Sequence, residues 1–295
     1  MKSKLLVLAA LFAIASSCAN DKNGKKDYLV TIHTEFGDMK AILYDETPLH
    51  KANFIELAEN GLYDSTTWHR IIKEFMVQGG GIDMKYRNYD STWFEKLLAN
   101  AGLSEKPEPI DAEIDKGYIH HKGALAAARM PDQVNPERKS SWCQFYIVQG
   151  KVFTEDELTL DQQKLNGSIS KLLADERFED LKNQFVELQM KRDFAAMNQL
   201  AMDNKDLVEQ ELGVDLSKDF DPDRLAVYTT TGGAPHLDDA YTIFGKVIDG
   251  LDVVDKLAGV ETARGDKPLE PTYLTIEVEL ISKKKITKMY GYEYE

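Results

Sequence analysis

Cysteine is scarce in this chain: 295 residues include only two, Cys18 and Cys143. Because Cys18 lies in a segment that reads as an export signal, Cys143 is left without a partner. We therefore exclude the disulfide framework that stabilises many secreted domains. Cys143 stands close to Trp142 and Phe145, and the sequence points to no neighbouring base for a catalytic thiol. We expect Cys143 to be a small buried residue.

Positive charge is also in short supply. Only 36 lysines and arginines face 50 aspartates and glutamates, so the net charge is -14. This balance excludes nucleic acid as an expected partner, because phosphate backbones are bound through clustered lysine and arginine. The acidic surplus is regional, since residues 151–224 hold 18 acidic and 10 basic residues.

Long apolar runs are absent after residue 15. The single run near the N-terminus, Leu5 to Ala15, follows a basic start and precedes Ser16-Ser17-Cys18, which is the order of a secretory signal. It is too short to be a permanent membrane-spanning helix. A cysteine after small residues also resembles a bacterial lipobox, although ordinary cleavage near Cys18 is an alternative. We expect an exported lipoprotein, anchored through Cys18 to a membrane of the bacterial cell envelope.

The segments that follow show patterns of short strands and helices. Residues 1–18 would be the signal peptide and the polar residues 19–27 a flexible tether. Tyr28–Thr34 and Met39–Tyr44 alternate in hydrophobicity and predict a β-hairpin. A helix should begin at Thr47-Pro48, with Gly61 as the residue just past its end. Later strands are expected at 123–129, 144–148, 227–231, 242–247 and 273–281, with a helix at 252–258 and a C-terminal tail at 284–295.

Two stretches interrupt the β pattern as insertions. The first, 82–110, contains a possible short helix at 91–98. The second, 151–224, opens with a capping box at Thr154 and Glu157 and continues with apolar residues at helical spacing. It predicts two or three amphipathic helices paired as a hairpin, the last ending at Gly213. This insertion either binds client proteins or only packs on the main domain, 28–283.

The stretch from Trp68 to Gly81 carries the most informative mixture of polar and apolar residues. As two short strands with a bend at Lys73-Glu74, it places Arg70, Met76 and Gln78 on one concave surface. The glycines at 79–81 are followed by neither Lys-Ser nor Lys-Thr, so we expect close backbone packing there and not a phosphate loop.

Four motifs in this chain, in the same order, resemble those of the cyclophilins. His69 to Ile72 with Phe75 to Gly80 is similar to FHRIIPGFMCQGG, and Gly123 to Arg129 stands in place of GILSMAN. Cys143 to Ile147 and Phe244 to Val247 correspond to SQFFI and FGKV. The resemblance covers about 28–81, 117–150 and 226–283. It implies a mainly β fold, a closed antiparallel eight-stranded barrel capped by helices, here with an α-helical insertion.

The resemblance also implies a set of site residues. Arg70 would be the catalytic cation and Gln78 its orienting neighbour. The remaining positions would bind substrate through a proline pocket, through backbone pairing along the groove or at its rim: Phe75, Met76, Tyr146, Leu237, Ala128, Arg129, Gln144, His69, His236 and Tyr241. The rim departs from the family, because His236, Tyr241 and Arg129 replace a common tryptophan, histidine and asparagine. We expect an altered substrate range, and Tyr146 brings a hydroxyl that needs a partner.

These residue types suit rotation about an X-Pro bond. Amide resonance gives this rotation a barrier of about 18–20 kcal/mol, and no bond has to break. A guanidinium can donate to the proline nitrogen as the amide twists, so neither nucleophile, cofactor nor metal is expected. Asp219 to Asp223 only begins like a calcium loop, and the adjacent His120 and His121 should face opposite ways.

The sequence thus leaves three hypotheses for function. The favoured one is a peptidyl-prolyl cis-trans isomerase acting on proline-containing segments of exported proteins. A second is a cyclophilin-like chaperone or binding module with weak or no isomerase activity, using the helical insertion. A third is a structural envelope lipoprotein. The oligomeric state stays open.

Overall fold

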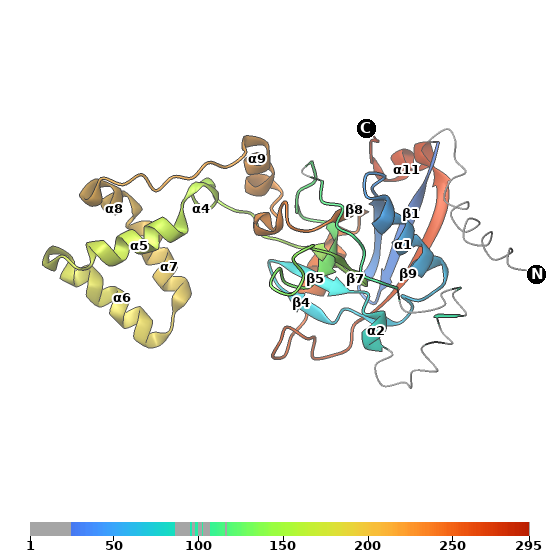
Figure 1. The fold of residues 1–295 in the computed structure, drawn as a ribbon, viewed down its shortest axis with the longest axis horizontal. Coiled ribbons are helices and arrows are strands. Elements are labelled where there is room, and N and C mark those ends of the chain that lie inside the picture. Colours follow the sequence, from blue (N-terminus) through green and yellow to red (C-terminus); the bar gives the residue numbers. More distant parts are fainter. Residues whose placement is uncertain are drawn as a thin grey trace, which may run out of the picture. The chain divides into compact units, whose positions relative to one another are not determined.

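A computed structural model describes residues 25–85, 95, 98–99, 102, 107–115 and 117–294 (Figure 1). The predicted signal peptide, Cys18 and most of the predicted 91–98 helix lie outside these residues. The chain divides into two compact units, 1–151 with 231–295, and 152–230. We call their described parts the sheet unit and the helical unit. In the part of the chain that is described, no helix is long and apolar enough to cross a membrane.

The sheet unit is built around nine antiparallel strands. They are β1 (Lys26–Thr34), β2 (Gly37–Leu43), β3 (Thr66–Thr67), β4 (Arg70–Ile72), β5 (Met76–Gly79), β6 (Ala124–Arg129), β7 (Ser140–Val148), β8 (Ile243–Asp249) and β9 (Tyr273–Ser282). The helices of this unit are α1 (Pro48–Glu59), α2 (Ile82–Lys85), the 3-10 turn η3 (Pro235–Leu237), α10 (Leu251–Ala258) and α11 (Lys283–Tyr290).

The strands are hydrogen-bonded in the order β3-β9-β1-β2-β8-β6-β7-β5-β4. The mainly β prediction is confirmed, whereas a closed barrel of eight strands is not: no ladder joins β3 to β4 among the described strands. Thr67 ends β3 and Arg70 begins β4, so the chain itself links the two ends of this order. The site described below lies on the β4–β5 hairpin at one of those ends.

Several predicted elements of the sheet unit are confirmed. β1 and β2 pair as a hairpin whose register ends at Thr34 opposite Gly37. Val30 and Ile32 point into the core from β1, as the alternation predicts. Helix α1 begins with Pro48, and α10 and β9 occupy the predicted ranges. β1 starts at Lys26, so the end of the predicted tether belongs to the sheet.

Aromatic rings form the centre of the sheet unit. The ring of Phe145 on β7 lies 5.5 Å from Phe54 of α1, 5.6 Å from Tyr63 and 5.7 Å from Trp68, measured between centroids. Helix α10 adds buried valines and a leucine to the same core. Because rings of this size bury large areas in fixed geometry, the β4–β5 hairpin rests on a rigid base.

The predicted C-terminal tail contains a helix. Ser282 caps α11 by accepting a hydrogen bond from the backbone N–H of Lys285 at 3.2 Å. Ile286 of α11 is fully buried against Leu29, Ile42 and Ile281. Its burial ties the end of the chain to β1, β2 and β9.

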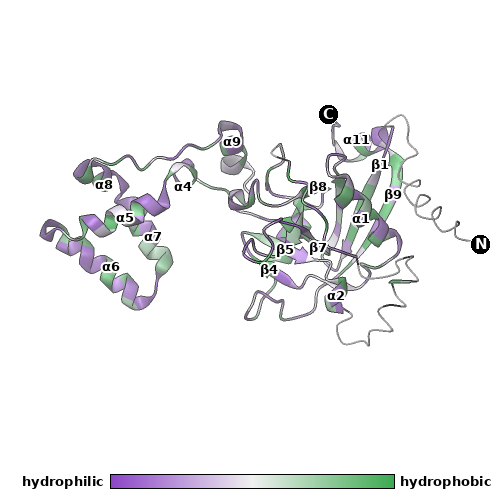
Figure 2. Cartoon of the chain, viewed as in Figure 1, coloured by the Kyte–Doolittle hydropathy of each residue, from purple (hydrophilic) through white to green (hydrophobic). Residues whose placement is uncertain are grey.

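The helical unit contains more helices than the two or three that the sequence predicts. They are α4 (Glu155–Thr159), α5 (Gln162–Leu172), the 3-10 turn η2 (Glu176–Phe178), α6 (Glu179–Lys191), α7 (Phe194–Asp203), α8 (Lys205–Leu212) and α9 (Pro222–Thr230). The capping box at Thr154 and Glu157 is confirmed, and Gly213 ends α8 in the left-handed region. Figure 2 shows hydrophilic and hydrophobic residues alternating along α5 and α6.

The predicted strand at 227–231 is wrong, because this segment belongs mostly to α9. Asp221 starts the helix by accepting hydrogen bonds from the backbone N–H groups of Asp223 and Arg224, both at 3.0 Å. Tyr228 is then fully buried, with its ring 6.3 Å from that of Phe220. The cap and this burial outweigh the strand preference of the β-branched residues in the segment.

Candidate functional site

The β4–β5 hairpin sets out the polar face that the alternation predicts. Arg70 pairs with Gln78, and Ile72 with Met76. Between these pairs Ile71 and Val77 turn into the core. Alternation along both strands therefore leaves Arg70, Met76 and Gln78 on the same side of the sheet.

A small cavity of about 100 Å³ lies over this face. Nine of the predicted site residues line it: Arg70, Phe75, Met76, Gln78, Ala128, Arg129, Tyr146, Leu237 and Tyr241. Most of its floor is buried and apolar, formed by Met76, Ala128, Leu237 and the ring of Tyr146. The cavity thus offers an apolar floor for a small ring, with the guanidinium groups of Arg70 and Arg129 among its lining.

The guanidinium of Arg70 is held by a residue that sequence reasoning missed. Its Nε donates to Oδ2 of Asp266 at 3.3 Å, and both side chains are partly exposed. The backbone N–H of Ile71 also donates to the carbonyl oxygen of Asp266 at 2.8 Å. Asp266 lies in the loop between α10 and β9, where it adopts a φ of 62°. Nothing in the spacing of the sequence indicates this pairing.

Gln78 makes a different contact from the one expected. It stands opposite Arg70 in the ladder, but its Nε2 donates to Oε1 of Gln144 at 3.1 Å. Gln144 in turn approaches Oδ1 of Asp83 at 3.4 Å. The hydrogen bonds of the two side chains thus join Gln78 to Gln144 and Arg70 to Asp266, and the orienting role of Gln78 stays a prediction.

A second, larger hollow adjoins the small cavity. It measures about 540 Å³ and shares Gln78, Ala128 and Arg129 with the first cavity. Gln144 lines it as well. An extended peptide with a ring in the small cavity would reach these groups with its neighbouring residues.

Arg129 and Tyr241 form a fixed part of the rim. The guanidinium carbon of Arg129 lies 4.3 Å from the ring centroid of Tyr241. Its Nε donates to the carbonyl oxygen of Ala240 at 2.9 Å, and its Nη1 pairs with Asp132. The Arg129 guanidinium lowers the pKa of the Asp132 carboxyl. The side chain of Arg129 is consequently only 4% exposed, compared with 42% for Arg70.

Two predicted histidines lie close to the cavity without lining it. The ring of His236 lies 5.1 Å from that of Phe75, and partial burial lowers the pKa of His236. Burial likewise lowers the pKa of His69, whose backbone N–H donates to the carbonyl oxygen of Gln78 at 3.0 Å. Both imidazoles are therefore mainly neutral near pH 7.

The hydroxyl of Tyr146 finds its partner in His120, a second residue that sequence reasoning missed as part of the site. The phenol oxygen lies 2.9 Å from Nε2 of His120, and Nδ1 of that ring lies 2.9 Å from Oδ1 of Asp238. All three side chains are buried. The neighbouring His121 instead bonds to the carbonyl oxygen of Lys122 and lines another cavity, so the two histidines do not converge.

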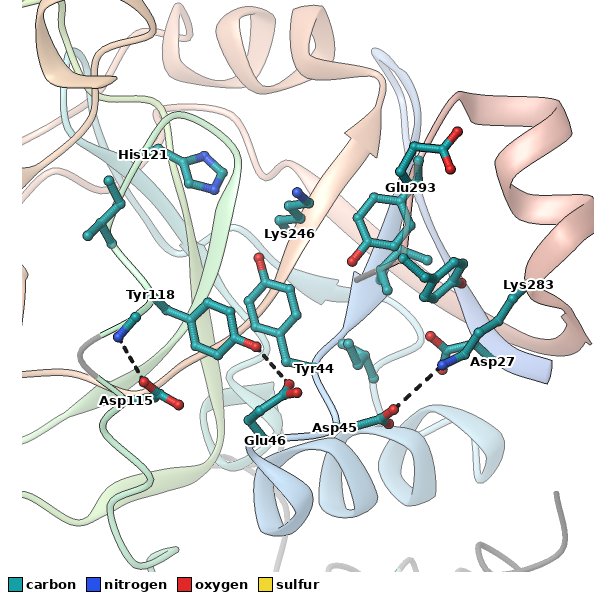
Figure 3. A pocket seen from close by; sticks show the side chains of 16 residues that line it. Asp27, Tyr44, Asp45, Glu46, Asp115, Tyr118, His121, Lys246, Lys283 and Glu293 are labelled. Atoms are coloured by element: carbon teal, nitrogen blue, oxygen red, sulfur yellow. Dashed lines mark hydrogen bonds and ion pairs between the residues drawn. The ribbon is translucent and has the colours of Figure 1, made fainter. Parts of the chain in front are cut away.

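That other cavity, shown in Figure 3, is a polar hollow of about 520 Å³. The rings of Tyr44 and Tyr118 stack in it at 4.1 Å, and the hydroxyl of Tyr118 donates to Glu46 at 2.7 Å. Lys283 approaches Asp45 at 3.8 Å. None of the predicted site residues lines it. We therefore place the candidate site at the small cavity.

The glycines and Cys143 serve packing. A Cβ on Gly80, whose φ is 75°, would lie 2.5 Å from the carbonyl oxygen of Cys143, so the expected close packing is confirmed. Burial raises the pKa of the Cys143 thiol to about 12, which keeps it protonated. Within the described ranges, no three or more histidine, cysteine, aspartate or glutamate residues are grouped so as to hold a metal ion.

Comparisons with known proteins show which family and which relatives this chain is similar to. Residues 29–170 and 218–278 match the family model for cyclophilin type peptidyl-prolyl cis-trans isomerase/CLD. A provisionally named bifunctional phosphatase/peptidyl-prolyl cis-trans isomerase of Streptococcus pyogenes is 29% identical over 253 residues, which are 84% of this chain. The chain spans only 38% of that longer relative.

Shorter relatives are matched over most of their length. A provisionally named peptidyl-prolyl cis-trans isomerase of Staphylococcus saprophyticus is 27% identical over 248 residues, 84% of this chain and 88% of that protein. Among solved structures, a cyclophilin type peptidyl-prolyl cis-trans isomerase of Cryptosporidium parvum aligns with a TM-score of 0.47 and 18% identity, covering 86% of this chain and 98% of that one.

Proposed function

The chain belongs to the cyclophilin-type peptidyl-prolyl cis-trans isomerase family, and from this premise we propose that it accelerates X-Pro rotation in exported proteins. Arg70 stabilises the twisted amide in this proposal, and the small cavity holds the proline ring. The observation that carries it is the partly exposed guanidinium of Arg70 beside a small cavity whose floor includes the buried side chains of Met76 and Leu237.

The proposed mechanism needs only binding and one donor. As the amide twists it loses resonance, and the nitrogen gains a lone pair that a guanidinium can approach. The planar amide has little of this lone pair, so the donor acts mainly on the transition state. Asp266 helps by fixing Nε of Arg70 before substrate arrives. Gln144 and the backbone of Ala128 and Arg129 would hold the flanking peptide.

A protease-coupled assay on an Ala-Pro peptide tests this role, with Arg70→Ala compared to the wild type. Removing one preorganised donor typically costs about 100-fold or more in rate, so we expect a loss of that order with an unchanged fold. Arg177→Ala is the matched control, because Arg177 is an exposed arginine that also pairs with carboxylates but lies in the helical unit. Equal rates for the wild type and Arg70→Ala would refute the assignment.

We also propose that the protein acts outside the cytoplasm while anchored through Cys18. The support is the order of basic residues, apolar run and Ser16-Ser17-Cys18 at the N-terminus. Metabolic labelling with palmitate should mark the wild type and spare Cys18→Ser. A Cys18→Ser protein that still takes up label would contradict the anchor.

A second candidate function, binding of unfolded clients, is favoured by one observation in the helical unit. Val186 and Met190 of α6 and Phe194 at the start of α7 are 43%, 75% and 64% exposed. Contiguous exposed apolar patches are typical of interaction surfaces, and these three side chains follow one another at intervals of four residues. Replacing all three with serine should reduce suppression of client aggregation while the Ala-Pro isomerisation rate is kept. Unchanged suppression would remove this candidate.

A further inference from the structure

A chain of three buried polar side chains, His120, Asp238 and Tyr146, runs behind the small cavity. The ring of Tyr146 lines that cavity, whereas the hydrogen bonds that join the three have no part in the mechanism above. His120 is 0% exposed and Tyr146 is 4% exposed. Oδ1 of Asp238 lies 2.9 Å from Nδ1 of His120, and Nε2 of His120 lies 2.9 Å from the hydroxyl of Tyr146. Placing three polar groups in a core costs free energy unless each is satisfied, and here each satisfies the next.

The directions of these hydrogen bonds follow from the donors present. The Asp238 carboxylate accepts from the backbone N–H of His120 at 2.9 Å and from its ring Nδ1. In the tautomer that carries its proton only on Nδ1, Nε2 of His120 is an acceptor, and the Tyr146 hydroxyl donates to it. In this arrangement the hydroxyl of Tyr146 is hydrogen-bonded inside the protein, which holds the tyrosine side chain in place.

His120 also holds the opposite wall of the cavity. Its carbonyl oxygen accepts from the backbone N–H of Ala234 at 2.8 Å, so one residue is bonded to both ends of the turn 234–238. That turn contains η3, which supplies Leu237 to the cavity floor and His236 beside Phe75. Tyr146 on β7 supplies the facing part of the floor.

We propose that His120 and Asp238 are positioning residues that set the spacing between Tyr146 and Leu237, and hence the fit of the proline ring. This inference rests on the proposed function of the cavity. The proline ring is present in both ground and transition states, so a change in fit alters binding of both alike. Loss of either residue therefore raises KM and Kd and leaves kcat nearly unchanged.

Three variants test the two hydrogen bonds of His120 separately. Tyr146→Phe keeps the ring and removes the hydroxyl, and Asp238→Ala removes the acceptor for His120. Asp238→Asn keeps an oxygen at Oδ1 and removes the charge. We measure KM and kcat by the coupled assay, and the Kd of the Ala-Pro peptide by NMR titration. Tyr146→Phe and Asp238→Ala should each raise KM and Kd about fivefold, which corresponds to about 1 kcal/mol of binding free energy, and Asp238→Asn should restore most of the affinity.

The matched control is Tyr63→Phe. Tyr63 is another buried tyrosine, whose hydroxyl donates to the carbonyl oxygen of Cys143 at 3.2 Å. It does not line the small cavity. Tyr63→Phe should lower the unfolding midpoint and leave KM and Kd unchanged. A purely structural role for Tyr146 would give the same result as this control and would overturn the inference.

The double variant Tyr146→Phe/Asp238→Ala supplies an independent criterion. If both residues act through His120, its Kd equals that of the weaker-binding single variant; multiplied effects would overturn the proposal. Arg70→Ala is carried as a reference. A wild type no faster than Arg70→Ala would refute the proposed function, while the Kd values would still decide the role of His120 and Asp238. If Asp238→Ala fails to fold, Asp238→Asn and Tyr146→Phe give the decision.

Discussion

The sheet unit and the helical unit differ most in how they build a core. The sheet unit packs aromatic rings against one another and closes α1 and α10 over them. In the helical unit, the core between α5, α7 and α8 has only small and aliphatic residues among its buried members, and α6 has no buried residue at all. Regions with many buried apolar contacts resist local unfolding, whereas short helices with few buried residues unfold locally at a lower free-energy cost. The candidate catalytic groups lie on the unit with the larger aromatic core.

The two units also differ in charge. All six histidines of the chain belong to the sheet unit. The helical unit holds most of a segment with 18 acidic and 10 basic residues. Changes of pH near neutrality should therefore act on one unit and spare the other.

The largest effect is expected from Phe145→Ala in the sheet unit. Deleting a buried phenylalanine ring costs about 3–5 kcal/mol of unfolding free energy. Isomerase activity and the near-UV circular dichroism should be lost together, while far-UV helical signal from the helical unit persists. Phe194→Ala is the control, because removing this exposed ring should change the unfolding free energy by less than about 0.5 kcal/mol. Loss of all signals in one transition would mean that the units do not unfold separately.

The converse change, Leu165→Ala, should affect only the helical unit. Leu165 of α5 is fully buried, so its truncation should cost about 2–4 kcal/mol. Helical signal should fall at a lower temperature, while the rate on the Ala-Pro peptide stays within about twofold, because the unit has its own core. Leu165→Met, which keeps the volume, is the milder control. A parallel fall in isomerase rate would break the distinction between the units.

The smallest effect is expected from pH. Burial lowers the pKa of His50, His69, His121 and His236, so the unfolded chain binds protons more readily than the folded one. Their contribution to stability is complete above about pH 6.5 and is lost as pH falls below it towards the folded pKa values. Between pH 7.5 and 5.5 we therefore expect the unfolding free energy of the sheet unit to fall.

Urea unfolding at both pH values measures this loss with probes for each unit. The helical unit should change little in that window, because its acidic groups with lowered pKa values, such as Asp175 and Glu187, titrate only at lower pH. An equal loss in both units would contradict the role of the histidines.

Local signals predicted much of the sheet unit. The alternation in β1 and β2, the proline that begins α1 and the two strands around Lys73-Glu74 were all readable from neighbouring residues. The prediction of a strand at 227–231 was wrong. The β-branched residues of this segment favour a strand, but the Asp221 cap and the burial of Tyr228 stabilise helix α9. The short helices of the helical unit were undercounted, because each contributes only a few apolar positions.

What the sequence determined by itself is the face of the site. Period-two alternation in a hairpin requires Arg70, Met76 and Gln78 to share a side, wherever that hairpin is placed. What only the tertiary structure decided is the set of residues that hold this face. Asp266 meets Arg70 across 196 positions, and Asp238 meets His120 across 118. Contacts over such separations depend on how distant loops are packed, and no periodicity in the chain encodes them.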